Sequence, residues 1–284
     1  MAPRAPAPPR APSPPVPTAA VSKKNFTIAP WLGENDGEKV ILYAPSGMGK
    51  TTLASMAPSP VFIGLDDGGR RIRNPKTGEP VDVVQDVETY ADVRAVLQSD
   101  ILLNHQTVVI DTVTVLQDLT IPHMLQYIPH EKGHYVKRLE DYGFGKGYTH
   151  MYELMMAVLA DLDRLVRRGK NILLLCQFRG AVRGNPSGED YVKAGPALYP
   201  GSKKDVANIQ AKYCEWADHI FRIDWENATV TDGKIAPVST RMVRTHPDAT
   251  FEAKSRGTLF ADYPAVTFSE PSDGSLWRIL FGGE

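Results

Sequence analysis

A strand-type run, a loop of small residues and a helix-type segment follow one another between residues 40 and 57. Residues 40–43 are apolar and β-type, and the loop after them ends in the tripeptide Gly49-Lys50-Thr51. Such a loop can turn its backbone N–H groups inward around a phosphate group. The Lys50 ammonium would then reach the β- and γ-phosphate oxygens, and the Thr51 hydroxyl would hold Mg²⁺. The feature predicts a phosphate-binding loop that takes ATP.

The predicted nucleotide contacts begin at the end of the strand and continue into the first turn of the helix. They are Ala44, Pro45, Ser46, Gly47, Met48, Gly49, Lys50, Thr51 and Thr52. Ala44 replaces the first glycine of G-x-x-x-x-G-K-[ST], which an ordinary backbone conformation at that position allows. A chance Gly-Lys-Thr on a glycine-rich turn is the alternative, but strand, loop and helix occur in the required order.

Two further strand-type runs end in aspartates. Residues 107–110 lead into Asp111, whose carboxylate we expect to help hold the Mg²⁺ ion. Residues 60–65 lead into Asp66 and Asp67, which are candidates for orienting the attacking water, with Asp67 preferred because it lies beside paired glycines. The alternative for these two carboxylates is that they cap a turn.

Gln177 ends another apolar run, 171–176, which is typical of a parallel sheet covered on both faces. Its side chain is placed to sense the γ-phosphate; a purely structural glutamine is the alternative. Because strands and helices alternate, we predict one α/β domain over residues 26–284. It would have three layers, a mainly parallel central sheet and a β-rich C-terminal edge. The carboxyl ends of its strands would gather the candidate polar groups.

Composition excludes several protein classes. The chain has 32 basic and 33 acidic residues, so any contact with nucleic acid must come from a local patch. Two cysteines give no disulfide framework and suit a reducing compartment. No apolar run approaches the ~18–20 residues that span a bilayer, and we expect no secretory signal because the first residues contain no apolar h-region. We therefore expect a cytoplasmic protein without membrane contact. Residues 1–25 are expected to form a disordered Pro/Ala-rich tail, which is either inert or binds a partner.

The motif His130-Glu131-Lys132-Gly133-His134 matches H-E-x-x-H, a zinc-protease pattern. That chemistry needs both histidines on one helical face, with the glutamate beside a metal-bound water. Pro129 precedes the match and Gly133 interrupts it, so we expect a solvated loop.

The remaining pattern gives coarse expectations. Helices are predicted at 88–98, capped by Asp86, and at 149–168 and 202–216. Strands are predicted at 218–225, 240–245 and 276–281, and a hairpin turn at 231–234. Residues 70–80 read as an exposed hairpin, and 121–148 and 178–201 as irregular, loop-like segments.

In their order along the chain, these features resemble the RecA-like ATPases. The resemblance rests on the phosphate loop, Asp66-Asp67-Gly68-Gly69, the strand that ends at Asp111, Gln177, and Lys254-Ser255-Arg256. More narrowly, the chain resembles the single-domain RecA-core proteins of bacteriophages that act in single-strand annealing recombination, over about residues 38–258. This resemblance implies a Mg²⁺-dependent ATPase that acts on single-stranded DNA, in the host cytoplasm if a phage encodes the protein. It also implies a ring or filament of identical subunits, with a single-stranded-DNA-binding protein as a further candidate partner.

The family's two DNA-facing loops correspond to 121–148 and 178–201. Local chemistry in the second segment agrees, since cations suit phosphates and aromatic rings suit base stacking. The candidate DNA-binding residues are Phe178, Arg179, Arg183, Tyr191 and Lys193. An ordinary surface loop is the alternative, and nearby acidic residues dilute the positive charge.

Two residues late in the chain, Lys254 and Arg256, follow a β-type segment around residues 250–253 and lie two positions apart, so in an extended chain they would point the same way. The resemblance implies that such a basic pair reaches the γ-phosphate bound by a neighbouring subunit; solvated surface charges are the alternative.

Two other functions remain open. A small-molecule or nucleotide kinase could use the same loop, with Arg70, Arg71 and Arg73 as a candidate lid. The other function is a nucleotide-gated DNA-binding module with negligible hydrolysis. The family usually has glutamate where this chain has the aspartates at the end of its second strand, and the shorter aspartate side chain reaches the attacking water less easily.

Overall fold

The computed structural model describes residues 36–69, 71–185, 188–201, 207–226, 230–231, 234–235 and 240–282. Within these ranges the side chains of Asp67 and of residues 230–231 and 234–235 are not described. The described residues belong to one compact unit over residues 35–284. The predicted tail, residues 1–25, and the predicted domain start at residue 26 lie outside them.

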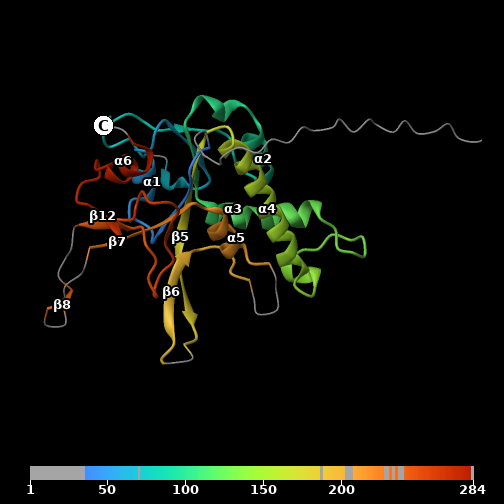
Figure 1. Ribbon diagram of the computed structural model, residues 1–284. Helices are drawn as coiled ribbons and strands as arrows, with labels where there is room; N and C mark the ends of the chain where they lie inside the picture. Colours follow the sequence, from blue (N-terminus) through green and yellow to red (C-terminus); the bar gives the residue numbers. More distant parts are fainter. Residues whose placement is uncertain are drawn as a thin grey trace, which may run out of the picture. The chain divides into compact units, whose positions relative to one another are not determined.

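A mainly parallel sheet forms the centre of this unit (Figure 1). Its parallel strands follow the order β7-β1-β5-β4-β2-β3. They are β1 (Lys39–Ala44), β2 (Pro60–Gly64), β3 (Asp82–Val83), β4 (Thr107–Asp111), β5 (Asn171–Arg183) and β7 (His219–Trp225). Antiparallel strands β10 (Arg241–Arg244) and β12 (Ala265–Phe268) extend the sheet beyond β7, and β11 (Lys254–Ser255) pairs with the start of β7. The predicted parallel sheet with a β-rich C-terminal edge is confirmed.

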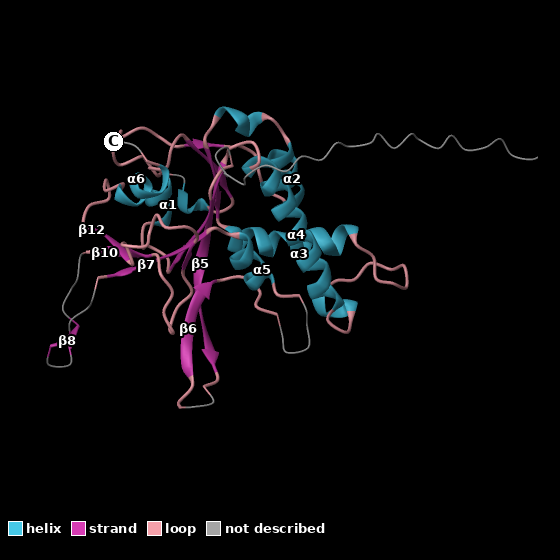
Figure 2. Ribbon diagram, viewed as in Figure 1, coloured by secondary structure: helices cyan, strands magenta, loops and turns pink. Residues whose placement is uncertain are grey.

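Helices cover both faces of the sheet (Figure 2). Helices α2 (Tyr90–Gln98), α3 (Val113–Tyr127), α4 (Lys146–Val166) and α5 (Ile209–Trp216) pack on one face, and α1 (Lys50–Ala54) and α6 (Ser275–Phe281) on the other. Alternation along β1 sends Ile41 and Tyr43 into the first core and Val40 and Leu42 into the second. The predicted three-layer arrangement is therefore confirmed. Short 3₁₀ turns lie at Asp67–Gly69, Ile101–Asn104 and Leu139–Tyr142.

The strand register brings the predicted polar positions to one edge of the sheet. Ala44 pairs with Gln177 across β1 and β5, and Asp111 of β4 lies beside β5 at Leu175 and beside β2 at Gly64. Ala44, Gly64 and Asp111 end their strands, and Gln177 lies beside Ala44, so these positions are at the carboxyl edge of the parallel strands, where open α/β sheets bind ligands.

The prediction of a loop at 178–201 was wrong, because β5 continues to Arg183 and pairs with β6 (Tyr191–Pro196) in an antiparallel hairpin. The hairpin projects beyond the parallel sheet (Figure 1). The strand persists outside the sheet because β6 satisfies its backbone hydrogen bonds.

The irregular segment predicted at 121–148 is confirmed over most of its length but wrong at both ends. Helix α3 runs to Tyr127 with Pro122 inside it, and α4 begins at Lys146 after Gly145 rather than at residue 149. The Thr112 hydroxyl caps α3 by accepting a hydrogen bond from the Val115 N–H at 3.3 Å. Packing of the helix against the sheet outweighs the cost of one proline.

Several boundaries differ from their predictions. The segment at 276–281, predicted as a strand, is helix α6, because Leu276, Trp277 and Leu280 bury one helical face. A short apolar run does not distinguish a strand from a buried helix. Helix α2 is capped by Thr89 rather than Asp86, through a capping box with Asp92.

Helix α5 begins at Ile209, with Asn208 as its N-cap, so the helix predicted at 202–216 is wrong at residues 207–208. The remaining strands and hairpins agree with their predictions where they are described. Strands β8 (Val230–Thr231) and β9 (Lys234–Ile235) form the expected hairpin, and 71–80 is a turn-rich hairpin closed by a bridge from Arg73 to Pro80. Residues 202–206 of the predicted helix lie outside the described residues. Among the described residues, no helix is both long and apolar enough to cross a membrane.

Candidate functional site

The loop between β1 and α1 has the backbone that a phosphate-binding loop requires. Gly47 and Gly49 adopt positive φ angles of 79° and 89°. Residues that carry a Cβ atom adopt such angles only at a cost in free energy. Ala44, in contrast, is the last residue of β1 and keeps a strand conformation. The replacement of glycine at that position therefore leaves the loop intact.

Lys50 is buried with its ammonium group folded across the loop. Its Nζ donates hydrogen bonds to the carbonyl oxygens of Ala44, at 2.9 Å, and Pro45, at 3.1 Å. It also lies 3.4 Å from Gln177 Oε1. Burial lowers the pKa of Lys50, and the nearby carboxylate of Asp111 opposes that shift. A phosphate group would replace neutral carbonyl partners with charged oxygens, which make stronger hydrogen bonds.

The Thr51 hydroxyl donates a hydrogen bond to Asp111 Oδ2 at 2.7 Å. Asp111 is nearly buried, and burial raises its pKa, although the bond from Thr51 favours the charged form. A hydroxyl and a carboxylate oxygen side by side fit Mg²⁺, which takes few protein ligands and completes its shell with phosphate oxygens and water. Among the described residues, no group of three or more His, Cys, Asp or Glu side chains could hold a metal ion alone.

Gln177 connects the phosphate-binding loop to the β5–β6 hairpin. Its backbone N–H donates to the Thr114 hydroxyl at 3.1 Å, and its carbonyl accepts from the Ala197 N–H at 2.8 Å. The residue after it, Phe178, begins the hairpin pairing. The sequence reasoning missed Thr114, whose position in α3 gives no local signal of a contact with β5.

Asp66 follows β2 and is exposed. Its Oδ1 accepts a hydrogen bond from the Gly68 N–H at 3.0 Å, so this carboxylate caps the short 3₁₀ turn that begins at Asp67. The turn-capping alternative is therefore what Asp66 does here. Its charge is close enough to raise the pKa of Asp111. Asp67 has no described side chain, and its role stays a prediction.

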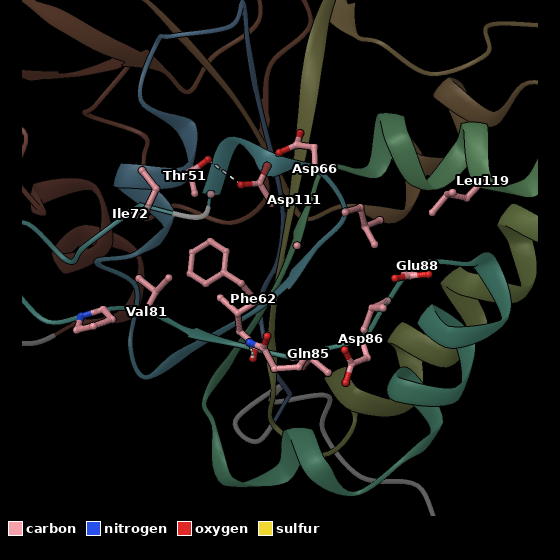
Figure 3. A pocket seen from close by; sticks show the side chains of 17 residues that line it. Thr51, Phe62, Asp66, Ile72, Val81, Gln85, Asp86, Glu88, Asp111 and Leu119 are labelled. Carbon is pink, nitrogen blue, oxygen red and sulfur yellow. Dashed lines mark hydrogen bonds between the residues drawn. The ribbon is translucent and has the colours of Figure 1, made fainter.

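A cavity of about 800 Å³ opens beside Thr51, Asp66 and Asp111 (Figure 3). From there it extends past Phe62 to a far end near Glu88. Its described lining combines apolar side chains with carboxylates and includes no Lys or Arg. Neither Arg71 nor Arg73 lines it, and Arg70 lies outside the described residues. The cavity can therefore accept an uncharged or cationic group more readily than a phosphate.

Arg241 also contacts the loop, which the sequence reasoning missed. Its Nη1 donates to the Met48 carbonyl at 3.0 Å, and its guanidinium lies 5.4 Å from the ring centre of Phe268. A Cβ atom at Gly49 would come within 2.6 Å of the same Nη1. More than 190 residues of chain separate this arginine from the loop, so no local sequence pattern predicts the contact.

Lys254 and Arg256 lie side by side, as predicted, at the C-terminal end of α5. Lys254 Nζ donates to the carbonyls of Cys214 and Glu215 at 2.6 and 3.2 Å. Arg256 donates to the same Glu215 carbonyl and to Asp218 Oδ1, both at 2.8 Å. Because β11 pairs with the start of β7, the pair occupies the sheet edge opposite the phosphate-binding loop. Its role toward a neighbour stays a prediction.

The register of the hairpin divides the five candidate DNA-binding residues between two faces. Arg179 pairs with Gly195, Ala181 with Lys193 and Arg183 with Tyr191, so the two arginines, Lys193 and Tyr191 share one face. We call these four residues the basic face. Phe178 lies on the opposite, apolar face with Val182 and Val192, which are 68% and 56% exposed. Lys193 pairs with Glu252 at 2.9 Å, whereas Arg179 and Arg183 pair with no carboxylate among the described residues.

The H-E-x-x-H segment forms a turn rather than a helix. The Gly133 N–H donates to the His130 carbonyl, and the His130 N–H donates to the His134 carbonyl. The two imidazole rings stack with their centres 4.8 Å apart, and Glu131 pairs with Lys146. This is not the helical arrangement that zinc proteases use.

Comparison with known proteins identifies the family to which the chain is similar. The model of a family described as an AAA domain matches residues 36–257. Among solved structures, the chain is similar to the RadB recombinase, with a TM-score of 0.39 and 12% identity over 74% of this chain and 80% of that one. It is also similar to the KaiC-like protein PH0186 from Pyrococcus horikoshii OT3, with a TM-score of 0.38 and 15% identity over 73% and 78% of the two chains. No curated protein matches.

Proposed function

This chain belongs to the AAA-domain family, and we propose that it is a Mg²⁺-dependent ATPase that acts on single-stranded DNA in phage-type recombination or annealing. The family match, an AAA domain, and the mainly parallel sheet support the prediction of a RecA-like P-loop ATPase domain. The phage origin, the cytoplasmic location and a partner single-stranded-DNA-binding protein stay predictions.

The contact between Thr51 and Asp111 supports the proposal most strongly. It joins the phosphate-binding loop to the end of β4 through two oxygen ligands that suit Mg²⁺. Bound between these residues and the phosphates, the ion would neutralise charge that develops on the transferred phosphoryl group. Lys50 already lies in the loop and would exchange its carbonyl partners for β- and γ-phosphate oxygens.

The water that attacks the γ-phosphate needs a carboxylate to orient it. Asp66 is exposed beside Thr51 and Asp111 in the shared cavity and accepts only the Gly68 N–H among its described contacts. One carboxylate oxygen therefore remains for a water. We assign this role to Asp66 or Asp67.

The basic face of the hairpin supports DNA as the polymer partner. Two arginines without carboxylate partners among the described residues can neutralise phosphates, and Tyr191 can stack on a base. The hairpin begins directly after Gln177, which contacts Lys50. Occupation of the loop by ATP and engagement of the hairpin by DNA are thereby connected through one strand.

An ATPase assay with and without single-stranded DNA tests this function. We expect turnover that needs Mg²⁺ and rises with DNA. Lys50→Ala should abolish ATP binding and turnover while the thermal melting curve stays cooperative. Lys212→Ala serves as the control, because Lys212 is an exposed lysine of α5 paired with Glu215. Equal ATP affinity in the wild type and Lys50→Ala would contradict the proposal.

The cavity beside Asp66 favours one second candidate, a phosphotransferase. A kinase needs an acceptor pocket next to the γ-phosphate, and this cavity lies there. Because none of its described lining residues is a cation, such an acceptor would be a neutral alcohol or nucleoside rather than a monophosphate. Turnover that rises with a nucleoside and not with DNA would favour this function. ATP and DNA binding with almost no phosphate release would favour the nucleotide-gated module.

A further inference from the structure

Arg241 and Phe268 lie at the same edge of the sheet as the phosphate-binding loop. Arg241 pairs with Trp225, the last residue of β7, and β7 runs parallel to β1. Phe268 pairs directly with Arg241 across β10 and β12. Both residues therefore occupy the carboxyl edge, on the opposite side of β1 from β5 and β4.

The direction in which a bound nucleotide must run follows from this arrangement. The Mg²⁺ ligands and Gln177 lie toward β5 and β4, so the γ-phosphate points that way. The α-phosphate, ribose and base must then leave the loop toward β7, β10 and β12. The side chains there, Thr52, Met56, Arg241, Phe268 and Pro271 among others, enclose only about 10 Å³, so a base would lie over their outer surface and not between them.

The chemistry of this half-exposed surface suits a planar, apolar group. The Arg241 guanidinium carbon lies over the Phe268 ring, 5.4 Å from the ring centre, so the cation and the aromatic face are in contact. Guanidinium groups stack on aromatic faces, and Met56 and Pro271 add apolar contact. The same guanidinium fixes the loop through the Met48 carbonyl at 3.0 Å.

We propose that Arg241 stacks on the base of the bound nucleoside triphosphate while its Nη1 holds the phosphate-binding loop. This inference rests on the proposed nucleotide binding. Arg241 is thus a binding residue for the nucleoside and a positioning residue for the loop. It links the two halves of the ligand, because one side chain touches the base and the backbone around the phosphates.

Binding of MgATP and of Mg-tripolyphosphate, measured by calorimetry on the full chain, separates the two roles. Tripolyphosphate fills the loop but has no base. In Arg241→Ala we expect the preference for ATP over tripolyphosphate to fall roughly tenfold, the order expected when one stacking contact is lost. Arg241→Lys keeps a donor for Met48 but lacks the planar group, so it should lose ATP affinity and keep that for tripolyphosphate. It also guards against a folding defect in the alanine variant.

Arg244→Ala is the matched control, because Arg244 lies on the same strand at its far end, paired with Arg222 and Ala265. It should bind both ligands as the wild type does. If Arg241→Ala and Arg241→Lys leave the ratio of the two affinities unchanged, the base does not contact Arg241 and the inference is wrong. A wild-type chain that binds neither ligand would instead disprove the nucleotide site itself.

Discussion

Thr51 and Asp111, sixty positions apart in the sequence, meet at a hydrogen bond of 2.7 Å from the hydroxyl to Oδ2. Thr51 follows β1 through the phosphate-binding loop, and Asp111 is the last residue of β4. The parallel register places the ends of β1 and β4 at one edge of the sheet, with β5 between the two strands. The bond aligns two oxygen ligands before any metal ion arrives. Burial raises the pKa of Asp111, and the bond from Thr51 opposes part of that shift by favouring the charged carboxylate.

Asp111→Asn tests the role of this pair. The amide keeps the shape and can still contact Thr51, but it lacks the charge that attracts Mg²⁺. We expect Mg²⁺-dependent turnover to fall by about 10- to 100-fold or more, the range for loss of groups that support a bound metal. ATP binding measured without Mg²⁺ should change little. Titration of Mg²⁺ against turnover provides the check, and an unaltered Mg²⁺ requirement would contradict the assignment.

The pH dependence of MgATP binding should reflect two shifted groups. Burial raises the pKa of Asp111, so its carboxylate takes up a proton at a higher pH than an ordinary aspartate, near 3.9. Mg²⁺ affinity should therefore weaken early on acidification. Burial lowers the pKa of Lys50, so on the alkaline side its charge is lost below the ordinary lysine value of about 10.4.

Calorimetric profiles of the wild type and Asp111→Asn distinguish the acid limb. Protonation of the nucleotide affects both proteins equally, so the difference between the two profiles belongs to the Asp111 carboxyl group. Parallel profiles down to the acid limit of folding would show that Asp111 does not titrate in this range.

The two faces of the hairpin should behave differently toward single-stranded DNA. Arg179→Ala with Arg183→Ala removes the two arginines that pair with no carboxylate among the described residues. Affinity should fall, and the slope of log affinity against log salt should become shallower by about 0.7 for each lost phosphate contact. Val182→Thr with Val192→Thr, on the apolar face, is the control and should keep the slope. Equal slopes in all three proteins would remove the basic face as the DNA site.

Arg256→Ala tests assembly around a shared site. Arg256 is half-exposed and pairs with Asp218 at the sheet edge opposite the loop, and exposed pairs contribute only about 0–1 kcal/mol. Its release toward a neighbour therefore costs little. We expect the variant to bind ATP and fold normally but to lose most DNA-stimulated turnover. A cation supplied across an interface is worth roughly 10³–10⁵ in rate where such arginines have been tested.

Mixing Arg256→Ala with Lys50→Ala subunits should restore part of the activity, because the second variant lends its intact arginine to the nucleotide bound by the first. Arg168→Ala is the control, since Arg168 forms a comparable exposed pair with Asp100. A mixture without recovery, from a protein that stays monomeric with ATP and DNA, would reject the shared site.

The sequence by itself determined the phosphate-binding loop and the polar ends of its strands. The backbone of the loop requires glycine at positions 47 and 49, where φ is positive. The apolar runs before Asp111 and Gln177 indicate that both faces of the sheet are covered. Such features depend on a few neighbouring residues, so a single stretch of chain carries them.

Only the tertiary structure decided which distant groups meet. The contact of Arg241 with Met48 depends on where β10 joins the sheet, and the grouping of Arg179 and Arg183 with Tyr191 and Lys193 on one face depends on the register of β5 and β6. The same holds for Lys254 and Arg256, whose position follows from the pairing of β11 with β7. Strand pairing is non-local and a shift of one residue exchanges the faces, so the local pattern leaves these contacts open until the whole sheet packs.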